Sequence, residues 1–474
     1  MNSEKQFVVV GGGLYSLILI GALLNEGVEP QRILLIESSN HLGGQFRSDV
    51  SKNQMLFDKG TRILYETGDQ RADKFIKRVI ERCPSSVLSG NRKDVGGTFS
   101  DGQFNFGSVY PSFHGLPSSL KVQILGEILM SIENQCKAVS SSSITLFGYL
   151  EERFGATARD LIHEPICQKL FRRSSADLSN RVLQIIPLNR LSGLSHQSML
   201  MLASSEALRS RLAFPDQLEL PKLRQVDFCG YYPKSFGIQN YVHIAENLIR
   251  EAGVDIRLGW SVAGIRKAHQ PSVAAEVLLR NQGGDLQLVT AERQVIWTLG
   301  LRALWSCSGL SDVALPEDQK EELGIIHFTV RDNTFMGGLY YAYCHDPKFR
   351  LFRLTNYSSY SGGVTGTGTF PITAEILADG MTDTELISTA AREIRAIMGS
   401  SIGDEAAVQY VGMSKGFLPV PDIRSESFWV LNSKKLAEYF DGTLASTGLM
   451  TGRPKFLGRD VVSELLSQID AGSV

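Results

Sequence analysis

Two glycines, a serine and a glutamate near the start of the chain have the spacing of a dinucleotide site. Gly11-x-Gly13-x-x-Ser16 follows one apolar run, and Glu37 ends the next. In such a turn the first glycine permits a sharp bend, the second lets the backbone approach a pyrophosphate, and the following helix directs N–H groups at the phosphates. Ser16 replaces the usual third Gly or Ala, and Glu37 can accept hydrogen bonds from an adenosine ribose. The pattern predicts a dinucleotide site.

A second group of residues bears on which dinucleotide binds. Gly43-Gly44 is followed by Arg47, and Asp58-x-Gly60 comes further along the chain. An NAD site has no physical need for a second glycine pair here. FAD is longer and bent, so its pyrophosphate and flavin would run past this loop, and small residues would leave that path open. The sequence therefore favours FAD, and the alternative is two unrelated surface turns.

The elements that must position these residues form a strand–helix–strand unit. Residues 7–10 and 33–36 are short apolar runs typical of strands buried on both faces, and residues 14–24 have helical length and composition. Such a unit has parallel strands and a right-handed crossover. Because glycines interrupt the first apolar stretch at 11–13, we interpret it as part of a fold and not as a secretion signal. We expect a cytoplasmic protein with no transmembrane segment.

The composition excludes several classes of protein. The chain has 474 residues, of which 43% are hydrophobic and 21% charged, and its formal net charge is −2. This length favours more than one compact unit, and this hydrophobic content argues against disorder. The balanced charge argues against nucleic acid as a partner. The eight histidines are scattered and the six cysteines form no C-x-x-C motif, so we expect neither a metal site nor disulfides.

Later parts of the chain alternate between helical and extended patterns. Residues 116–180 and 238–251 show helical signals, residues 255–265 and 326–370 show strand signals, and residues 281–284 have the composition of a hairpin turn. The simplest architecture is one nucleotide-binding domain built from three separated segments. One mainly helical and one sheet-rich insertion would form a second lobe.

Several motifs together resemble the amine oxidase superfamily, which includes protoporphyrinogen oxidase, phytoene desaturases and UDP-galactopyranose mutase. Residues 8–60 are similar to its FAD-binding opening, residues 146–155 to the helical insertion of protoporphyrinogen oxidase-like proteins, residues 232–265 to the return to the FAD domain, and residues 447–453 to a segment that contacts the flavin. The resemblance implies an α/β, two-lobed flavoprotein. Its Rossmann-like FAD-binding domain would have three discontinuous segments, joined by a helical insertion and a mixed-sheet substrate domain.

The motifs and the resemblance together assign domains and cofactor contacts. The expected domains are an FAD-binding segment at 1–75, a mainly helical insertion at 76–228, a second FAD-binding segment at 229–312, a sheet-rich substrate domain at 313–420 and a third FAD-binding segment at 421–474. The expected FAD contacts are Gly11, Gly13, Leu14, Tyr15, Ser16, Glu37, Ser38, Gly43, Gly44, Gln45, Arg47, Gly60, Thr61, Arg62, Val262, Gly452, Arg453, Phe456 and Leu457. By the resemblance, Val262 would lie beside the adenine.

A narrower resemblance concerns residues 349–360, which are similar to the segment of UDP-galactopyranose mutases that carries an active-site arginine near the flavin. The resemblance implies that Arg353 is catalytic and that its planar fork binds a diphosphate or a carboxylate. The expected substrate contacts are Tyr341, Tyr343, Arg353, Asn356 and Tyr360. The alternative is a tyrosine-rich strand that packs against its neighbour, with Arg353 in a structural ion pair.

Two departures from the family leave the reaction open. Gly60-Thr61-Arg62 stands where mutases carry a Gly-Gly-His turn, and no lysine matches the one that holds a water at flavin N5 in amine oxidases. We expect an FAD-dependent oxidoreductase that transfers hydride at flavin N5 on a small polar substrate, with NAD(P)H as a candidate reductant. One alternative is a non-redox mutase acting on a nucleotide sugar. The other is a flavin-binding but catalytically silent partner of another enzyme.

Overall fold

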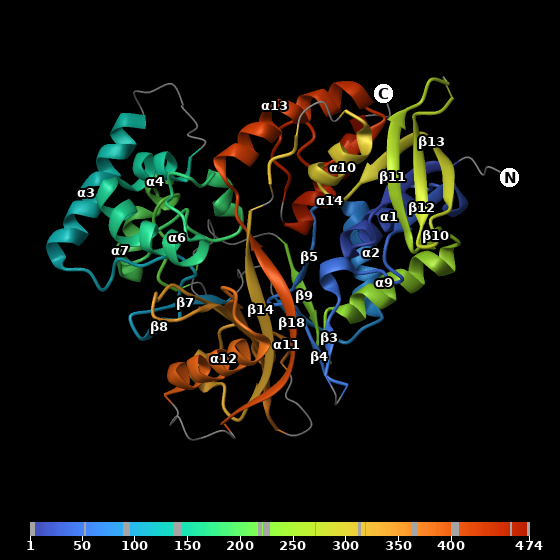
Figure 1. The fold of residues 1–474 in the computed structure, drawn as a ribbon. Helices are drawn as coiled ribbons and strands as arrows, with labels where there is room; N and C mark the ends of the chain where they lie inside the picture. Colours follow the sequence, from blue (N-terminus) through green and yellow to red (C-terminus); the bar gives the residue numbers. More distant parts are fainter. Residues whose placement is uncertain are drawn as a thin grey trace.

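Two large sheets and a group of helices form the molecule (Figure 1). The first sheet and its helices lie at the right of Figure 1, the second sheet lies below, and the helical group lies at the left. The computed structural model describes residues 5–51, 54–88, 95–135, 145–216, 220, 228–270, 272–310, 314–317, 319–362, 368–399, 407–455 and 457–471.

The first sheet joins strands from three distant parts of the chain. Among the described residues its order is β10–β2–β1–β13–β12–β11, and β19 also pairs with β13. The strands are β1 (Lys5–Val10), β2 (Ile33–Glu37), β10 (Asp255–Leu258), β11 (Trp260–Lys267), β12 (Ala275–Asn281), β13 (Leu286–Trp297) and β19 (Leu444–Ser446). The β10–β2, β2–β1, β1–β13 and β13–β19 pairs are parallel. The β13–β12 and β12–β11 pairs, which extend the sheet, are antiparallel. The first sheet therefore does use three separated segments.

Helices cover both faces of this sheet because its central strand is apolar on both sides. Phe7 and Val9 of β1 pack with α1, α2, α9 and α14, whereas Val8 and Val10 pack with α10 and α13. The helices are α1 (Leu14–Asn25), α2 (Gln70–Glu81), α9 (Gln239–Ala252), α10 (Leu301–Ser308), α13 (Ile423–Phe440) and α14 (Gly458–Ala471). A layer on each face is the arrangement that a parallel sheet requires.

The second sheet has the order β18–β14–β17–β16–β15–β7–β8 and is antiparallel except at the β15–β7 pair. Its strands are β7 (Gly96–Ser100), β8 (Gln103–Asn105), β14 (Lys320–Val330), β15 (Tyr341–Cys344), β16 (Leu351–Asn356), β17 (Phe370–Leu377) and β18 (Val408–Pro419). One face packs against α12 (Asp383–Met398), and α11 (Tyr357–Ser361) follows β16 directly. This sheet accounts for the strand signals expected within residues 313–420.

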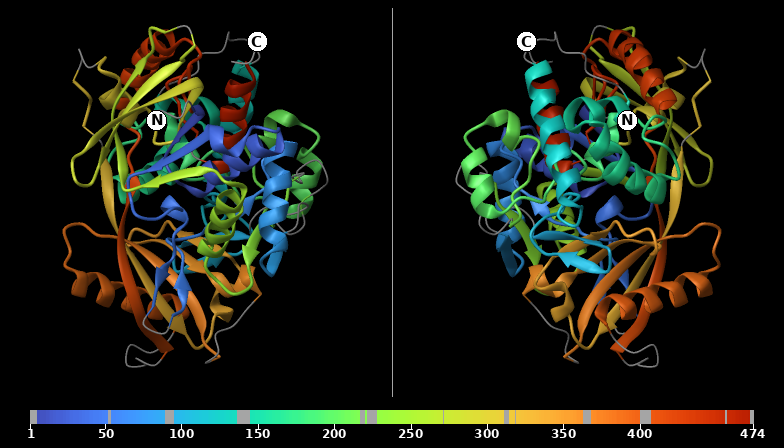
Figure 2. Two further views of the ribbon diagram at one scale, coloured as in Figure 1. Left: turned by 90° about the vertical axis from the view of Figure 1, so that its right-hand side faces the viewer. Right: turned by 90° about the vertical axis from the view of Figure 1, so that its left-hand side faces the viewer.

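The interval 76–228, expected to be mainly helical, contains helices and strands. Its helices are the end of α2, α3 (Ser118–Gln135), α4 (Leu146–Phe154), α5 (Ala156–Ala158), α6 (Glu164–Phe171), α7 (His196–Leu202) and α8 (Glu206–Arg209). However, β7 and β8 from this interval complete the second sheet, because the small residues Gly96 and Gly97 let β7 approach Tyr341 and Leu339. Figure 2 shows the helical group beside that sheet from two further sides. Among the described residues, no helix has the length and apolar character needed to cross a bilayer.

Short elements connect these layers. They are β3 (Asp49–Val50) paired with β4 (Leu56–Phe57), the three-stranded sheet of β5 (Leu64–Tyr65), β9 (Gly230–Pro233) and β6 (Ser85–Leu88), and the helical turns η1 (Pro30–Arg32), η2 (Gly44–Phe46), η3 (Arg159–His163), η4 (Asn180–Gln184) and η6 (Thr334–Met336). The strand expected at 255–265 is broken at Gly259, where φ is +73°, so β10 pairs with β2 while β11 pairs with β12. The serine run at 140–143, where the sequence predicts a break between two helices, lies outside the described residues.

Two helical glycines with opposite surroundings provide a test of this packing. A methyl group at Gly21 of α1 would lie 2.1 Å from Cγ of Phe75, whereas one at Gly126 of α3 would meet no described atom within 4 Å. We expect Gly21→Ala to destabilise the protein by about 1–3 kcal/mol through overpacking. Gly126→Ala, the matched control, should stabilise it by about 0.5–1 kcal/mol through helix propensity. Thermal unfolding midpoints measure both effects, and equal midpoints would contradict the packing of α1 on α2.

Candidate active site

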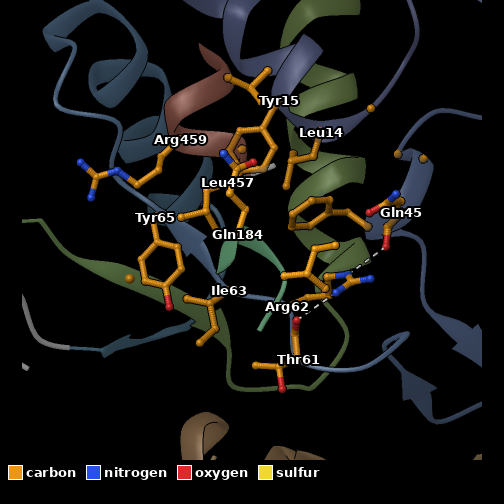
Figure 3. A pocket seen from close by; sticks show the side chains of 18 of the residues that line it. Leu14, Tyr15, Gln45, Thr61, Arg62, Ile63, Tyr65, Gln184, Leu457 and Arg459 are labelled. Atoms are coloured by element: carbon orange, nitrogen blue, oxygen red, sulfur yellow. Dashed lines mark hydrogen bonds between the residues drawn. The ribbon is translucent and has the colours of Figure 1, made fainter. Parts of the chain in front are cut away.

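A cavity of about 1460 Å³ lies between the two sheets and opens along the start of α1. At one end it is lined by the glycine turns and by Glu37, and at the other by Tyr341, Tyr343 and Arg353 of the second sheet. Figure 3 shows its middle part, where side chains from both ends of the chain converge. The structure therefore brings most of the expected cofactor and substrate residues around one space.

The turn between β1 and α1 has the properties of a phosphate site. Gly11 has φ +102°, and a Cβ there would lie 2.4 Å from Oγ1 of Thr298. At Gly13, by contrast, a Cβ would meet no described atom within 4 Å. No side chain caps the helix at Gly13, and the first turn of α1 holds no acidic residue. The first N–H groups of a helix lack intrahelical acceptors, so this end of the cavity attracts an anion.

Glu37, at the end of β2, is held by hydrogen bonds against the same turn. The Gly12 N–H donates to its Oε2 over 2.7 Å, and the Ser39 N–H donates to its Oε1 over 2.8 Å. Burial opposes ionisation, but these hydrogen bonds outweigh it and hold the pKa of Glu37 below its usual value. Glu37 is therefore an ionised acceptor at the cavity wall. Ser38 donates to Glu37 from outside the cavity lining.

The second glycine turn packs directly on the first. Gly43, at φ +115°, forms a bridge with Gly13, and its N–H donates to the Gly12 carbonyl over 2.7 Å. Gly44 follows so closely that a Cβ would lie 3.4 Å from the Gly13 Cα. Gly43, Gly44 and Gln45 all line the cavity. The second glycine turn therefore lies beside the first at the cavity wall.

The middle of the cavity combines residues from the first and last segments. Leu14, Tyr15 and Ser16 of α1, Thr61 and Arg62 before β5, and Leu457 before α14 all contribute to its lining. The Tyr15 ring packs so tightly on Gly458 that a Cβ there would lie 1.7 Å from Cε2 of the ring. Ser16 turns its hydroxyl toward Thr298, 3.1 Å away, at the contact between helix and strand.

Arg353 lines the cavity, but its charge is already matched. Its Nε donates to Oε2 of Glu375 over 2.5 Å and its Nη2 to Oε1 over 2.9 Å, which makes a bidentate pair. The side chains of Arg353 and Glu375 are 15% and 5% exposed, so solvent screens the pair little. Burial lowers the pKa of Arg353, but the charge of Glu375 outweighs it and raises the pKa above its usual value. The structural ion pair considered as an alternative is present.

The other expected substrate residues divide into two groups. Tyr341 and Tyr343 alternate along β15 and face the cavity. Asn356 and Tyr360 do not line it, because they lie at the end of β16 and in α11, where both are buried. Asn356 donates to Ser359, and the Tyr360 ring packs edge-on against Tyr232 at 4.5 Å. These two residues occupy core positions.

Several expected cofactor residues also lie away from the cavity lining. Val262 packs in the core on the far side of the first sheet, and Arg453 pairs with the buried Glu426 over 2.6 Å. A Cβ at Gly452 would lie 2.5 Å from the Trp429 carbonyl. Arg47 and Gly60 flank lining residues without belonging to the lining. Phe456 lies outside the described residues.

Sequence reasoning missed several residues that line the cavity. They are Gly12, Phe46, Ile63, Tyr65, Val87, Leu88, Val95, Val109, Tyr110, Gln184, Ile185, Phe228, Gly230, Thr298, Leu299, Tyr340, Gly458, Arg459, Val461 and Leu465. A signal existed for Thr298 and Leu299, since both follow β13 at the carboxyl end of a parallel sheet, where ligands bind in such folds. The residues at 87–110 and 184–185 come from the interval expected to be helical, and no motif marks them.

Comparisons with known proteins agree with this fold. Residues 9–79 match the family model described as an NAD(P)-binding Rossmann-like domain. No curated protein sequence matches the chain. Among solved structures, reduced UDP-galactopyranose mutase aligns with a TM-score of 0.66 at 12% identity, covering 99% of this chain and 95% of that chain.

Two further structures align over nearly the whole chain. Putrescine oxidase bound to putrescine aligns with a TM-score of 0.58 at 13% identity, and the alignment covers 100% of this chain and 100% of that chain. An oxidoreductase from Methanosarcina mazei has a TM-score of 0.57 at 13% identity, covering 98% of this chain and 99% of that chain. The chain therefore has the α/β fold of these proteins. The resemblance inferred from sequence is confirmed at the level of the fold.

The hydrogen bonds of Glu37 predict a pH-dependent contribution to stability. Because the folded-state pKa is depressed, the contribution is present above the unfolded-state value of 4.5 and is lost as pH falls through the lower folded-state pKa. We expect Glu37→Gln to destabilise the protein by about 1 kcal/mol at pH 7, and the difference to close in acid. Thermal midpoints from pH 7 downward measure this, with the exposed Glu152→Gln as control. If the difference in thermal midpoint between the wild type and Glu37→Gln does not change with pH, Glu37 is not ionised in this contact.

The Arg353–Glu375 pair predicts strong coupling between two substitutions. Glu375→Leu leaves a buried guanidinium without its partner and should cost about 3–5 kcal/mol of stability. The double variant Arg353→Met/Glu375→Leu removes both charges and should recover most of that loss. Denaturant unfolding of the two variants makes the comparison. If the double variant is no more stable than Glu375→Leu alone, the stability lost in Glu375→Leu does not come from leaving the Arg353 charge unpaired.

Proposed function

We propose that the protein is an FAD-dependent oxidoreductase that carries out hydride transfer at flavin N5 on a small polar substrate. The observation that carries the proposal is the continuity of the cavity from Glu37, past the uncapped start of α1, to Tyr341, Tyr343 and Arg353. A ligand that touches both ends must be extended and must carry an anionic centre beside Gly13. FAD meets both requirements, and bound FAD would supply the redox chemistry.

The residues present fit such a group. The open space above Gly13 leaves room for a pyrophosphate at the first N–H groups of α1, and Glu37 is an ionised acceptor for ribose hydroxyls. The tight contact of Tyr15 with Gly458 fixes the start of α14 at the cavity wall. Tyr341 and Tyr343 can orient a polar substrate at the far end.

A second candidate is a non-redox enzyme similar to UDP-galactopyranose mutase, favoured by the TM-score of 0.66 with that fold. The Arg353–Glu375 pair weighs against it, because a guanidinium held bidentately by a carboxylate has less capacity to hold a diphosphate. Turnover separates the two candidates. An oxidoreductase consumes one donor and one acceptor in each cycle, whereas a mutase consumes no stoichiometric reductant.

The first experiment is an absorbance spectrum of the purified protein, repeated after incubation with FAD and, without oxygen, after addition of NADPH. We expect a bound flavin spectrum. Amines and UDP-sugars are then supplied as candidate substrates, and flavin reduction or sugar isomerisation is measured. A protein that carries no flavin and does not bind added FAD would overturn the proposal.

A substitution at Gly13 tests the placement of the pyrophosphate. The Gly13 backbone, at φ −69° and ψ 161°, accepts any residue, and its Cβ direction is open. We therefore expect Gly13→Val to fold with an unchanged thermal midpoint but to weaken FAD binding by at least about tenfold. Gly115→Val, at another open glycine outside the cavity, is the matched control. Flavin fluorescence measures the dissociation constants, and unchanged affinity in Gly13→Val would place the pyrophosphate elsewhere.

A further inference from the structure

Arg62 and Arg353 both line the cavity, and their charges are compensated differently. Arg353 is held bidentately by Glu375. Arg62 donates from Nη1 to the Thr61 carbonyl over 3.1 Å and from Nε to the Gln45 carbonyl over 3.4 Å. Among the described residues, no carboxylate lies within ion-pair distance of Arg62. The Arg353 pair is therefore neutral, whereas Arg62 brings a net positive charge to the cavity.

The turn that carries Arg62 is fixed against the second sheet. A Cβ at Gly60 would lie 2.6 Å from Nη2 of Arg353, and the Thr61 hydroxyl lies 3.1 Å from that of Thr355. Figure 3 shows the Arg62 side chain between Gln45 and Thr61, with both carbonyl contacts drawn. A guanidinium has five N–H donors in a planar fork, and the two carbonyls use two of them. The remaining donors are held in place with little freedom to turn away.

A guanidinium in this position is costly without an anion. Burial lowers the pKa of Arg62, and the like charge of Arg353 lowers it further. The charges of Glu375 and Asp58 oppose this shift but do not outweigh it. Carbonyl oxygens satisfy hydrogen bonds but do not neutralise the charge. An oxyanion that enters the cavity would supply both a counter-charge and acceptors for the free donors, and charge-assisted bonds of this kind are the strong ones.

We propose that Arg62, and not Arg353, is the binding residue for an oxyanion in this cavity. The ligand group is a phosphate or carboxylate, supplied either by the pyrophosphate of the cofactor or by the substrate. The inference rests on the proposed function only for the identity of the cofactor. The positive charge of Arg62, which has no carboxylate within ion-pair distance among the described residues, does not depend on that function.

The experiment uses the FAD-loaded protein titrated with inorganic pyrophosphate, and the apoprotein titrated with FAD. Arg62→Gln should weaken at least one of these two interactions by about tenfold or more, the loss expected for a charge-assisted contact. Arg62→Lys keeps the charge and should retain most of the affinity. Arg392→Gln, an exposed arginine on α12, is the matched control and should bind as the wild type does. Flavin difference spectra and fluorescence provide the readouts.

The two arms separate the sources of the anion. Weaker FAD binding with normal pyrophosphate binding assigns Arg62 to the cofactor, and the reverse assigns it to an anionic substrate. Wild-type affinity in both arms for Arg62→Gln would overturn the inference. If Arg62→Gln does not fold, wild-type affinities that are unaffected by added salt would overturn it instead, because a charge contact weakens with ionic strength.

Failure of the proposed function can be distinguished from failure of the anion site at Arg62. If the wild type binds no FAD, calorimetric titration of the chain with pyrophosphate still tests the site. Binding that Arg62→Gln removes would keep the anion site while the cofactor proposal falls. Absence of pyrophosphate binding to the wild type under those conditions would overturn the anion site as well.

Discussion

The approach of Gly11 to the end of β13 fixes the position of the cavity. Because Gly11 has φ +102° and no side chain, the Thr298 N–H and hydroxyl can both reach the Val10 carbonyl, at 3.0 and 2.8 Å. Thr298 then contacts the Ser16 hydroxyl at the start of α1. On the other side of that helix, the Tyr15 ring lies against Gly458, where α14 begins. Elements from the first, second and last parts of the chain thus meet around one helix N-terminus. Any larger residue at position 11 would separate the strand end from the turn and move the first N–H groups of α1 out of line.

A buried hydrogen-bond network ties the segment around Asp58 to the second sheet, because the Tyr357 hydroxyl lies 2.7 Å from Oγ1 of Thr373 in β17. The Asp58 carboxylate accepts from Ser48, Tyr232 and the Ile238 N–H, and the Tyr357 hydroxyl donates to the Asp58 carbonyl over 2.6 Å. Burial raises the pKa of Asp58 despite these donors. The network holds the second sheet at a fixed distance from the glycine turns. The cavity is therefore a gap between two anchored surfaces, which suits a site where a cofactor and a substrate must meet in a defined geometry.

The strand–helix–strand unit was predictable because it depends on local apolar runs and on glycines whose roles are set by their immediate neighbours. Tyr341 and Tyr343 were expected as substrate contacts from the resemblance at residues 349–360, and the alternation of side chains along β15 places both on the cavity lining. The role of Arg353 did not follow, because its partner Glu375 comes from another strand and is placed by the register of β16 and β17. Asn356 was misplaced for a similar reason, since the chain turns into α11 at that residue. Resemblance over a short segment thus pointed to residues that line the cavity but could not show that the charge of Arg353 is already matched by Glu375.

The two ends of the cavity differ in how they attract a ligand. At the glycine end, the attraction comes from backbone N–H groups and one carboxylate, so it selects phosphate and hydroxyl groups that many nucleotides share. Toward the sheet end, it comes from tyrosines and from Arg62, which has no carboxylate within ion-pair distance among the described residues and whose charge Glu375 and Asp58 offset only from further away. For the proposed function, selectivity for the substrate would therefore arise at the second end. Since the neighbouring Arg353–Glu375 pair is neutral but polar, a ligand there meets a positive charge at Arg62 beside a fixed dipole. This arrangement favours an anionic group over a cationic amine.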